Sequence, residues 1–398
     1  MTLPARLTCL MLSVACVPAG AVTARVAASA PALASAPAAA ASASEATHRP
    51  AQMTVRIGAA LPLSGAQQPY GREVLDAMRM AVADLDAQDL RIGGRPVRWV
   101  LDARDDTSGA AATARALVAD GVAAVVGDLG SRAVARSAPV YFAAGVPQIT
   151  PSAGDPKLAQ RGWQTFHRIV ANDDALGAAL ALYAGRRLHA RRAMIVGDDS
   201  STGRGVARAF ERAAPGAGLQ MLPAARASAV APLVAAVRAA APDVVLYRGR
   251  AVFGAALLRA LRVGGVHARF LGARRLCSRD FARLAGRDAD ADVVCVQGGD
   301  VLDRTPAGTA WRQRFDALYG AGVFQLYAPY AYDATMVLAH AMVAAGSSVG
   351  RDYAPLLRQR AFAGVTRRDI RFNVDGELLR PHVTIDDFSH GAKQALNR

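Results

Sequence analysis

Short apolar runs that predict strands alternate with segments of helical periodicity along most of this chain, and this alternation constrains the fold more than any other feature. The runs that predict strands are residues 55–61, 97–101, 123–126, 147–150, 193–196, 244–247, 270–271 and 293–296. Between them, segments such as residues 74–85 place apolar side chains on one face of a helix. A helix between successive strands favours a parallel sheet with helices on both faces. The predicted fold class is therefore α/β.

A single sheet with this many strands would be unusually wide, so we expect two Rossmann-like lobes with parallel sheets. The predicted crossings between the lobes lie near residues 168–174, 298–305 and 373–377, the last of which contains the turn sequence Asn-Val-Asp-Gly-Glu. Three crossings form a hinge and leave a cleft between the lobes. The first predicted lobe comprises residues 54–171 and 300–373, and the second comprises residues 172–299 and 377–398.

The amino terminus has the pattern of a targeting signal. Arg6 precedes an apolar run over residues 7–17, and the small residues Ala19-Gly20-Ala21 offer a cleavage site. We expect residues 1–21 to be a secretory signal peptide, and the Ala-, Ser- and Pro-rich residues 22–50 to be a disordered tether. A lipoprotein anchored at Cys16 is the alternative, although Leu12 lies one place too far from that cysteine. The mature protein is predicted to be periplasmic.

The net charge of the sequence raises the question whether the protein binds nucleic acid. The net charge is +15, and arginine supplies all but two of the 47 basic residues, which indicates a compositional bias. Without a basic stripe interleaved with aromatic residues, nucleic acid is not an expected partner.

Cys9 and Cys16 fall in the signal segment, so Cys277 and Cys295 remain. In an oxidising compartment they are either a disulfide or two separate buried thiols.

The sequence contains no catalytic constellation that we can identify. The seven histidines are scattered without metal-ligand spacing, and neither a G-x-S-x-G elbow nor a Walker A loop occurs. Gly203-Arg204-Gly205 lacks the third glycine of a dinucleotide-binding loop. We therefore expect a binding protein without a cofactor or a metal rather than an enzyme.

Two consecutive strand–turn units over residues 123–156 predict a ligand-binding edge. The strand over residues 123–126 is followed by a polar turn ending at Ser131, and the strand over residues 147–150 is followed by a turn containing Ser152. Ligands bind beyond the carboxyl ends of parallel strands. Pro139 predicts that the intervening helix starts near Ser137, which leaves Ser131 and Arg132 in a loop facing the cleft.

Several motifs occur in a fixed order along the chain. They are Ile57-Gly58-Ala59-Ala60-Leu61-Pro62-Leu63-Ser64-Gly65 with Tyr70-Gly71, Asp105-Asp106, Val125-Val126-Gly127 with Ser131, Ile149-Thr150-Pro151-Ser152, Tyr327-Ala328-Pro329-Tyr330-Ala331-Tyr332-Asp333-Ala334 and Asn373-Val374-Asp375-Gly376. In order and spacing these motifs resemble those of the type I periplasmic solute-binding proteins, especially the leucine-, isoleucine- and valine-binding proteins of ABC transporters. The similarity runs from about residue 54 to residue 388.

The resemblance implies a ligand site on the first lobe. Ser131 and the backbone N–H groups of the turn Ser152-Ala153-Gly154 correspond to the groups that hold a ligand's carboxylate, and Gly154 replaces a threonine typical of the amino-acid binders. Tyr70 corresponds to an aromatic residue that covers the ligand, and Tyr327 lies in another matching motif. The resemblance also implies an ABC permease in the inner membrane as the partner.

The second lobe departs from the family pattern. The acidic residue that pairs with a ligand's ammonium corresponds to Arg274, and a ligand-contacting tyrosine corresponds to Arg250. A guanidinium favours an anion instead of a cation, and Arg132 adds positive charge. We therefore expect a small carboxylate or another anion without a free amine, unless these arginines are exposed products of the compositional bias. The alternatives to transport are a ligand-sensing module that docks on a receptor and an enzyme on a Rossmann-like scaffold.

Overall fold

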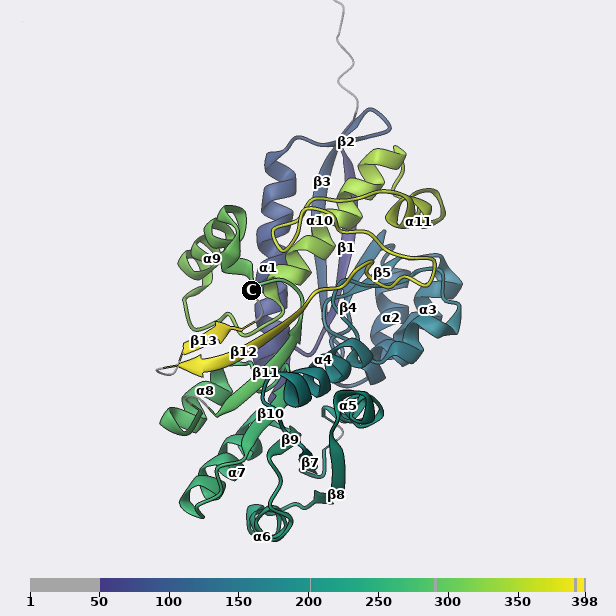
Figure 1. Cartoon of the computed structure of the whole chain (residues 1–398). Helices are drawn as coiled ribbons and strands as arrows, with labels where there is room; N and C mark the ends of the chain where they lie inside the picture. The colour runs from purple at the N-terminus through teal and green to yellow at the C-terminus, as the bar shows by residue number, and fades with distance from the viewer. Residues whose placement is uncertain (1–50, 201, 290–291, 390–391, 397–398) are drawn as a thin grey trace, which may run out of the picture. The chain divides into compact units, whose positions relative to one another are not determined.

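The computed structural model describes residues 51–396 except residues 201, 290–291 and 390–391. The predicted signal peptide and tether, with Cys9 and Cys16, lie outside the described residues. The described chain forms two α/β lobes, each built on its own sheet (Figure 1). Among the described residues, no helix combines the length and the apolar character that crossing a membrane requires.

The first lobe contains a sheet whose strands are parallel apart from one edge hairpin. Its strands lie in the order β2 (Arg91–Ile92), β3 (Arg95–Asp105), β1 (Met53–Leu61), β4 (Ala124–Gly127), β5 (Gln148–Thr150) and β6 (Phe166–Arg168), with β2 antiparallel to β3. Alternating side chains of β4 enter different cores: Ala124 and Val126 pack on one face, and Val125 packs on the other. This two-residue period is what a sheet covered on both faces requires.

Six helices cover the two faces of this sheet. The larger core contains side chains from α1 (Gln68–Ala87), α9 (Pro306–Tyr319), α10 (Ala328–Ala345) and α11 (Gly350–Gln359). Helices α1 and α10 lie side by side over that face (Figure 1). The other face packs against α2 (Ala110–Ala119) and α3 (Ser131–Ala144).

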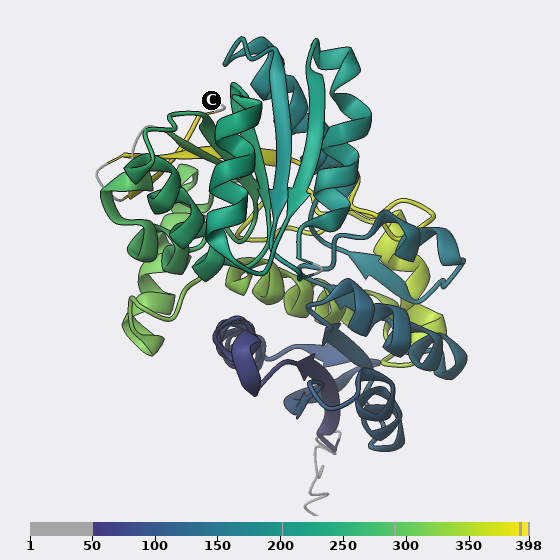
Figure 2. The same ribbon diagram turned by 90° about the horizontal axis from the view of Figure 1, so that it is seen from below.

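The second lobe is organised in the same way around a wider sheet. Its strand order is β13 (Ala392–Ala395), β12 (Val383–Ser389), β11 (Val293–Gly298), β10 (Arg269–Ala273), β9 (Val244–Arg248), β7 (Arg192–Gly197) and β8 (Gln220–Arg226). One face packs against α4 (Asp173–Arg186) and α5 (Arg204–Ala213), and the other against α6 (Val230–Ala240), α7 (Ala251–Val263) and α8 (Arg279–Ala285). Helices flank this sheet on both sides in Figure 2.

The chain passes between the lobes at three places. It leaves the first lobe between β6 and α4, and returns between β11 and α9. The predicted turn at residues 373–377 is present, with the Gly376 N–H bonded to the Asn373 carbonyl at 3.0 Å. Leu378 still packs in the first core, so the third passage follows it and leads into β12. The residue limits given above for the two lobes remain predictions.

The prediction that the helix after β4 starts near Ser137 is wrong. Helix α3 begins at Ser131 and contains Pro139 in its interior. A proline inside a helix removes one backbone hydrogen bond, which normally disfavours this arrangement. Here the Ser137 hydroxyl is buried and bonds both the Asp128 carboxylate and the Val134 carbonyl, which anchors the helix ahead of the proline. Ser131 and Arg132 therefore lie in the first turn of a helix and not in a loop.

Several elements have no clear signal in the sequence and were not predicted. They are the edge strand β8, whose side chains are largely exposed, helices α9 to α11, and the terminal antiparallel strands β12 and β13. Helix α10 is buried almost all round and so lacks an amphipathic period. The described residues also form five short 3₁₀ helices: η1 (Gly65–Gln67), η2 (Pro156–Arg161), η3 (Pro215–Ala217), η4 (Gly286–Ala289) and η5 (Leu302–Arg304).

Candidate ligand-binding site

A cleft of about 830 Å³ is lined by residues of both lobes. This volume is within the range of small-molecule sites, about 300–1,000 Å³. The first lobe contributes the segments that follow β1, β3, β4 and β5, and the second contributes those that follow β7, β9 and β10. The cleft therefore lies at the carboxyl ends of strands in both sheets, where α/β folds bind ligands.

Most of the residues predicted from the sequence lie together in this cleft. Its lining includes eight of the nine predicted positions: Tyr70, Ser131, Arg132, Ser152, Ala153, Gly154, Arg274 and Tyr327. The ninth, Arg250, is not among the lining residues. Its guanidinium is exposed and pairs with Asp198, with Nε 3.0 Å from Oδ2. A ligand role for the eight remains a prediction.

Ser131 joins the two turns of the first-lobe wall. Its hydroxyl oxygen accepts hydrogen bonds from the N–H groups of Gly154 and Asp155, both at 3.1 Å. With both lone pairs occupied, the hydroxyl offers a ligand only its proton, which an anionic oxygen accepts. Gly130 caps α3 without a side-chain hydrogen bond. The first N–H groups of α3 therefore remain available beside this hydroxyl, and they also favour an anion.

The other predicted backbone donors are engaged within the protein. The Ser152 and Ala153 N–H groups bond the Thr150 hydroxyl oxygen at 3.4 and 3.1 Å. The Ser152 hydroxyl is buried and donates to the Leu129 carbonyl at 2.6 Å. In this arrangement the turn shapes the wall, and of the predicted hydroxyl and backbone donors the Ser131 hydroxyl is the one left for a ligand.

A buried polar cluster lies beneath the same wall. Asp128 is fully buried, and its carboxylate accepts hydrogen bonds from Ser137 and from Gln148 Nε2, the latter at 3.1 Å. Its carbonyl accepts from the Thr150 hydroxyl at 2.7 Å. Burial raises the pKa of Asp128 well above its usual value, and the adjacent carboxyl of Asp106, which lines the cleft, raises it further. Two carboxyls in contact share a proton more readily than they ionise together.

Arg168 links the site to the hinge, and no motif in the sequence marked it. This fully buried arginine at the end of β6 forms a bidentate pair with Glu377, with Nε 3.0 Å from Oε2. Its Nη1 donates to the carbonyls of Ala153 at 2.6 Å and Asp155 at 3.0 Å. One guanidinium thus holds the cleft turn and the segment that precedes the third passage between lobes.

Tyr70 and Tyr327 form the aromatic part of the cleft, with ring centroids 5.9 Å apart. Glu73 holds the backbone of Tyr327 in place, because its buried carboxylate accepts hydrogen bonds from the N–H groups of Gln325, Leu326 and Tyr327 at 2.8 to 3.0 Å. Burial raises the pKa of Glu73 to about 7, while these N–H groups oppose the shift. Nothing in the sequence pattern marked Glu73, because its partners lie some 250 residues away.

Arg274 and Arg275 project from the turn after β10, and among the residues that the structure describes only Arg274 has a carboxylate partner. Arg274 Nη1 lies 2.7 Å from Asp173 Oδ1, so its charge is compensated. Arg275 places its guanidinium 4.0 Å from the ring centroid of Tyr70 and donates to Gln67 Oε1 at 2.9 Å. Both of these contacts cross the cleft, since Tyr70 and Gln67 belong to the first lobe.

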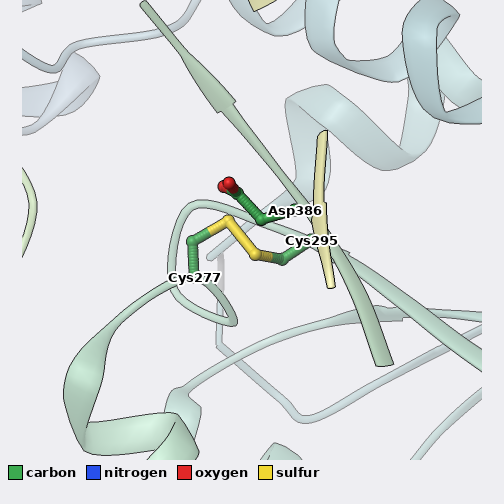
Figure 3. Close-up of side chains that lie close together, drawn as sticks. All are labelled: Cys277, Cys295 and Asp386. Atoms are coloured by element: carbon green, nitrogen blue, oxygen red, sulfur yellow. A yellow bond between two sulfur atoms is a disulfide. The ribbon is translucent and has the colours of Figure 1, made fainter. Parts of the chain in front are cut away.

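A disulfide fixes this turn. Cys277 and Cys295 are bonded, with their Cα atoms 5.3 Å apart, so the structure resolves the alternative that the sequence left open. The bond ties the segment carrying Arg275 to β11. Asp386 lies beside it, and the three side chains form a compact group (Figure 3). Because both sulfurs are in the disulfide, the group offers no thiolates and is a poor metal site.

The charged residues of the cleft are predominantly cationic. Seven arginines and three aspartates line it. Within the described residues, Arg274 is the one of these arginines with a carboxylate partner within 4.0 Å. The aspartates are engaged: Asp173 by Arg274, Asp155 by the Lys157 N–H, and Asp106 beside Asp128. The cleft thus offers cations to a ligand, and its carboxylates already have partners.

Comparison with known proteins identifies the family. The sequence matches the periplasmic binding protein family over residues 54–383. The chain belongs to this family. It is 25% identical over 353 residues to the leucine-, isoleucine-, valine-, threonine- and alanine-binding protein of Pseudomonas aeruginosa, covering 87% of this chain and 93% of that protein.

Solved structures show the same fold. The branched-chain amino acid transporter substrate-binding protein LivJ of Streptococcus pneumoniae, in complex with isoleucine, has a TM-score of 0.75 at 22% identity, covering 86% of this chain and 99% of that one. A solute-binding protein of an ABC transporter from R. palustris, in complex with benzoate, has a TM-score of 0.73 at 17% identity, covering 86% and 96%. The predicted α/β fold of two lobes is confirmed.

Proposed function

We propose that this protein is the periplasmic solute-binding component of an ABC importer, and that its cleft binds a small solute with a carboxylate and no free ammonium group. The protein then carries out no chemical reaction and delivers its ligand to an inner-membrane permease. Family membership supports the transport role, because the Pseudomonas aeruginosa relative is named for the amino acids it binds, the LivJ structure as a transporter substrate-binding protein, and the R. palustris structure as an ABC transporter solute-binding protein.

The observation that carries the ligand class is the charge of the cleft. A zwitterionic amino acid needs a carboxylate for its ammonium group, yet the position that the family resemblance assigns to that acid is Arg274. Asp173 lies close by, but Arg274 already pairs with it at 2.7 Å. A buried ammonium without a counter-ion is unfavourable, whereas a carboxylate finds the Ser131 hydroxyl and several guanidiniums.

Isothermal titration calorimetry tests this ligand class. The titrants are leucine and valine as zwitterions, and butanoate, hexanoate and benzoate as anions without an amine. We expect the protein to bind at least one of the anions and neither amino acid. Tight binding of leucine or valine together with no binding of the simple carboxylates would overturn the proposal.

A Ser131→Ala variant tests the anion-binding wall. Loss of one hydrogen bond to a charged group costs about 1.5–3 kcal/mol, so the carboxylate affinity should fall about ten- to hundredfold. Ser228→Ala is the matched control, because Ser228 is exposed and does not line the cleft. Equal affinities in the two variants would show that the Ser131 hydroxyl does not bind the ligand.

A further inference from the structure

Arg248 is held in a defined position at the second-lobe wall of the cleft. It is the last residue of β9, and its stem packs against two glycines: a Cβ added to Gly197 would lie 2.7 Å from Arg248 Cγ, and one added to Gly203 would lie 3.2 Å from Arg248 Cβ. Its Nη1 donates to the Ser200 carbonyl at 3.0 Å. A side chain at Gly197 would collide with the backbone and the stem of Arg248, whereas at Gly203 the φ of +71° favours glycine by itself.

The charge of Arg248 is only partly compensated by the protein. Among the described residues, no carboxylate lies within 4.0 Å of it, and the nearby Asp198 is occupied by Ser200 and Arg250. Partial burial, Arg226 and Arg204 lower the pKa of Arg248, and Asp198 opposes this shift without reversing it. A half-buried cation beside like charges is unfavourable until an anion binds.

Compositional bias explains exposed arginines but does not explain this one. An arginine that merely replaces lysine on the surface leaves its charge in water. Arg248 is half-buried, lies at a strand end, and shares the cleft lining with Arg204 and Ser131. A single carboxylate at Ser131 would leave the second-lobe cations without a counter-charge.

We infer that the ligand carries a second anionic group, a carboxylate or a phosphate, which binds Arg248 while the first group binds at Ser131. This inference rests on the proposed function and narrows it from an anion to a ligand with two anionic groups.

Calorimetry with matched pairs tests the inference. One arm compares succinate with butanoate and adipate with hexanoate, and the other compares phosphoglycolate with glycolate. We expect at least one doubly anionic member to bind at least about tenfold more tightly than its singly anionic match. The arm with the larger ratio identifies the second group as carboxylate or phosphate. Ratios near one in both arms would overturn the inference.

Variants then locate the second group. Arg248→Gln should lower the affinity for the tighter doubly anionic ligand at least about tenfold. The ratio of its affinity to that of the singly anionic match should then approach one. Arg248→Lys keeps the charge and should retain part of the preference for the doubly anionic ligand. Arg186→Gln is the control, because it removes an exposed charge of the same lobe outside the cleft. Thermal melting checks that each variant folds. An unchanged ratio in Arg248→Gln would overturn the assignment.

Failure of the proposed function gives a different pattern. In that case leucine or valine would bind and neither member of any pair would, so the ratio would not be measurable. If singly anionic ligands bind as tightly as doubly anionic ones, the proposed function stands and this inference fails.

Discussion

Buried carboxyl groups beneath the cleft are tolerated only because neighbouring groups donate hydrogen bonds to them or share a proton with them. Asp128 is the strongest case, since it is fully buried and lies against the Asp106 carboxyl. Its Oδ2 accepts from Ser137 and Gln148, whereas Oδ1 lacks a hydrogen-bond donor. The two carboxyls therefore fit best when they share one proton.

This arrangement predicts a pH-dependent stability. Because the folded-state pKa of Asp128 is raised, the folded protein holds a proton that the unfolded chain has already released. The free energy of unfolding should therefore fall as the pH rises above the unfolded-state value of about 3.9. An Asp128→Asn variant keeps an acceptor for Ser137 and places an amide donor toward Asp106. We expect it to be more stable than the wild type at pH 7, by at least about 1 kcal/mol, and to lose part of this advantage at pH 4.

Urea unfolding at pH 4, 5.5 and 7 measures this effect. Asp375→Asn is the control, because Asp375 is exposed in a turn and should leave the pH dependence unchanged. If Asp128→Asn were less stable than the wild type at every pH, Asp128 would be ionised in the folded state, and the shared proton would be excluded.

At the scale of elements, the hinge and the cleft turn depend on one side chain of β6. Arg168 pairs with Glu377 and also donates to the carbonyls of Ala153 and Asp155. Removing one partner of a buried pair costs about 3–5 kcal/mol. Arg168→Met should therefore lower the free energy of unfolding by about that amount and weaken ligand binding, because the turn behind Ser131 loses its anchor.

A lysine at position 168 separates charge from geometry. It keeps the positive charge but cannot form the bidentate pair and the two carbonyl contacts together. We expect intermediate stability by urea unfolding, with carboxylate affinity by calorimetry closer to that of the methionine variant. Arg358→Lys serves as the control, since that side chain bonds the Gln164 carbonyl away from the cleft. Unchanged affinity in Arg168→Met would show that the turn is held without this arginine.

Local sequence patterns predicted the helices and strands that have a clear apolar period. Elements that were misplaced or not predicted depend on contacts with residues far away in the sequence or on burial on all sides. Alternation of strands and helices was sufficient to predict two parallel sheets. Pro139 misplaced the start of α3, because the anchor of that helix is Ser137 bonded to Asp128 across the strand end. Helix α10 was not predicted because it is buried on nearly all sides and so has no amphipathic period.

The same distinction applies to the site. Ser131 and Tyr70 were predicted from motifs that are contiguous in the sequence. Glu73, Arg168 and Arg275 act through partners that are more than 200 residues away in the chain, and no local pattern reveals such contacts. The sequence pointed to Arg250 for the second-lobe wall, whereas Arg248, two residues earlier, lines the cleft.

At the scale of the whole described chain, the charges of the cleft arginines determine how favourable it is for the two lobes to approach each other. Unpaired cations on both walls repel one another, and an anionic ligand between them removes that repulsion. Proteins of this architecture close around their ligands by hinge motion. Arg275 is the one of these cations with a specific contact across the cleft, to the Tyr70 ring and to Gln67.

Arg275 should therefore stabilise the closed form in addition to contributing charge. A cation–π contact is worth about 0.5–2 kcal/mol, so Arg275→Ala should weaken the affinity for a carboxylate roughly two- to thirtyfold. Small-angle X-ray scattering at saturating ligand separates the two roles. We expect the radius of gyration of wild type to fall on binding, and that of Arg275→Ala to fall less even when every site is filled. Arg259→Ala, whose side chain bonds Leu284 within the second lobe, should behave as wild type. If Arg275→Ala compacts as fully as the wild type, the contact with Tyr70 does not hold the lobes together, and Arg275 acts through its charge alone.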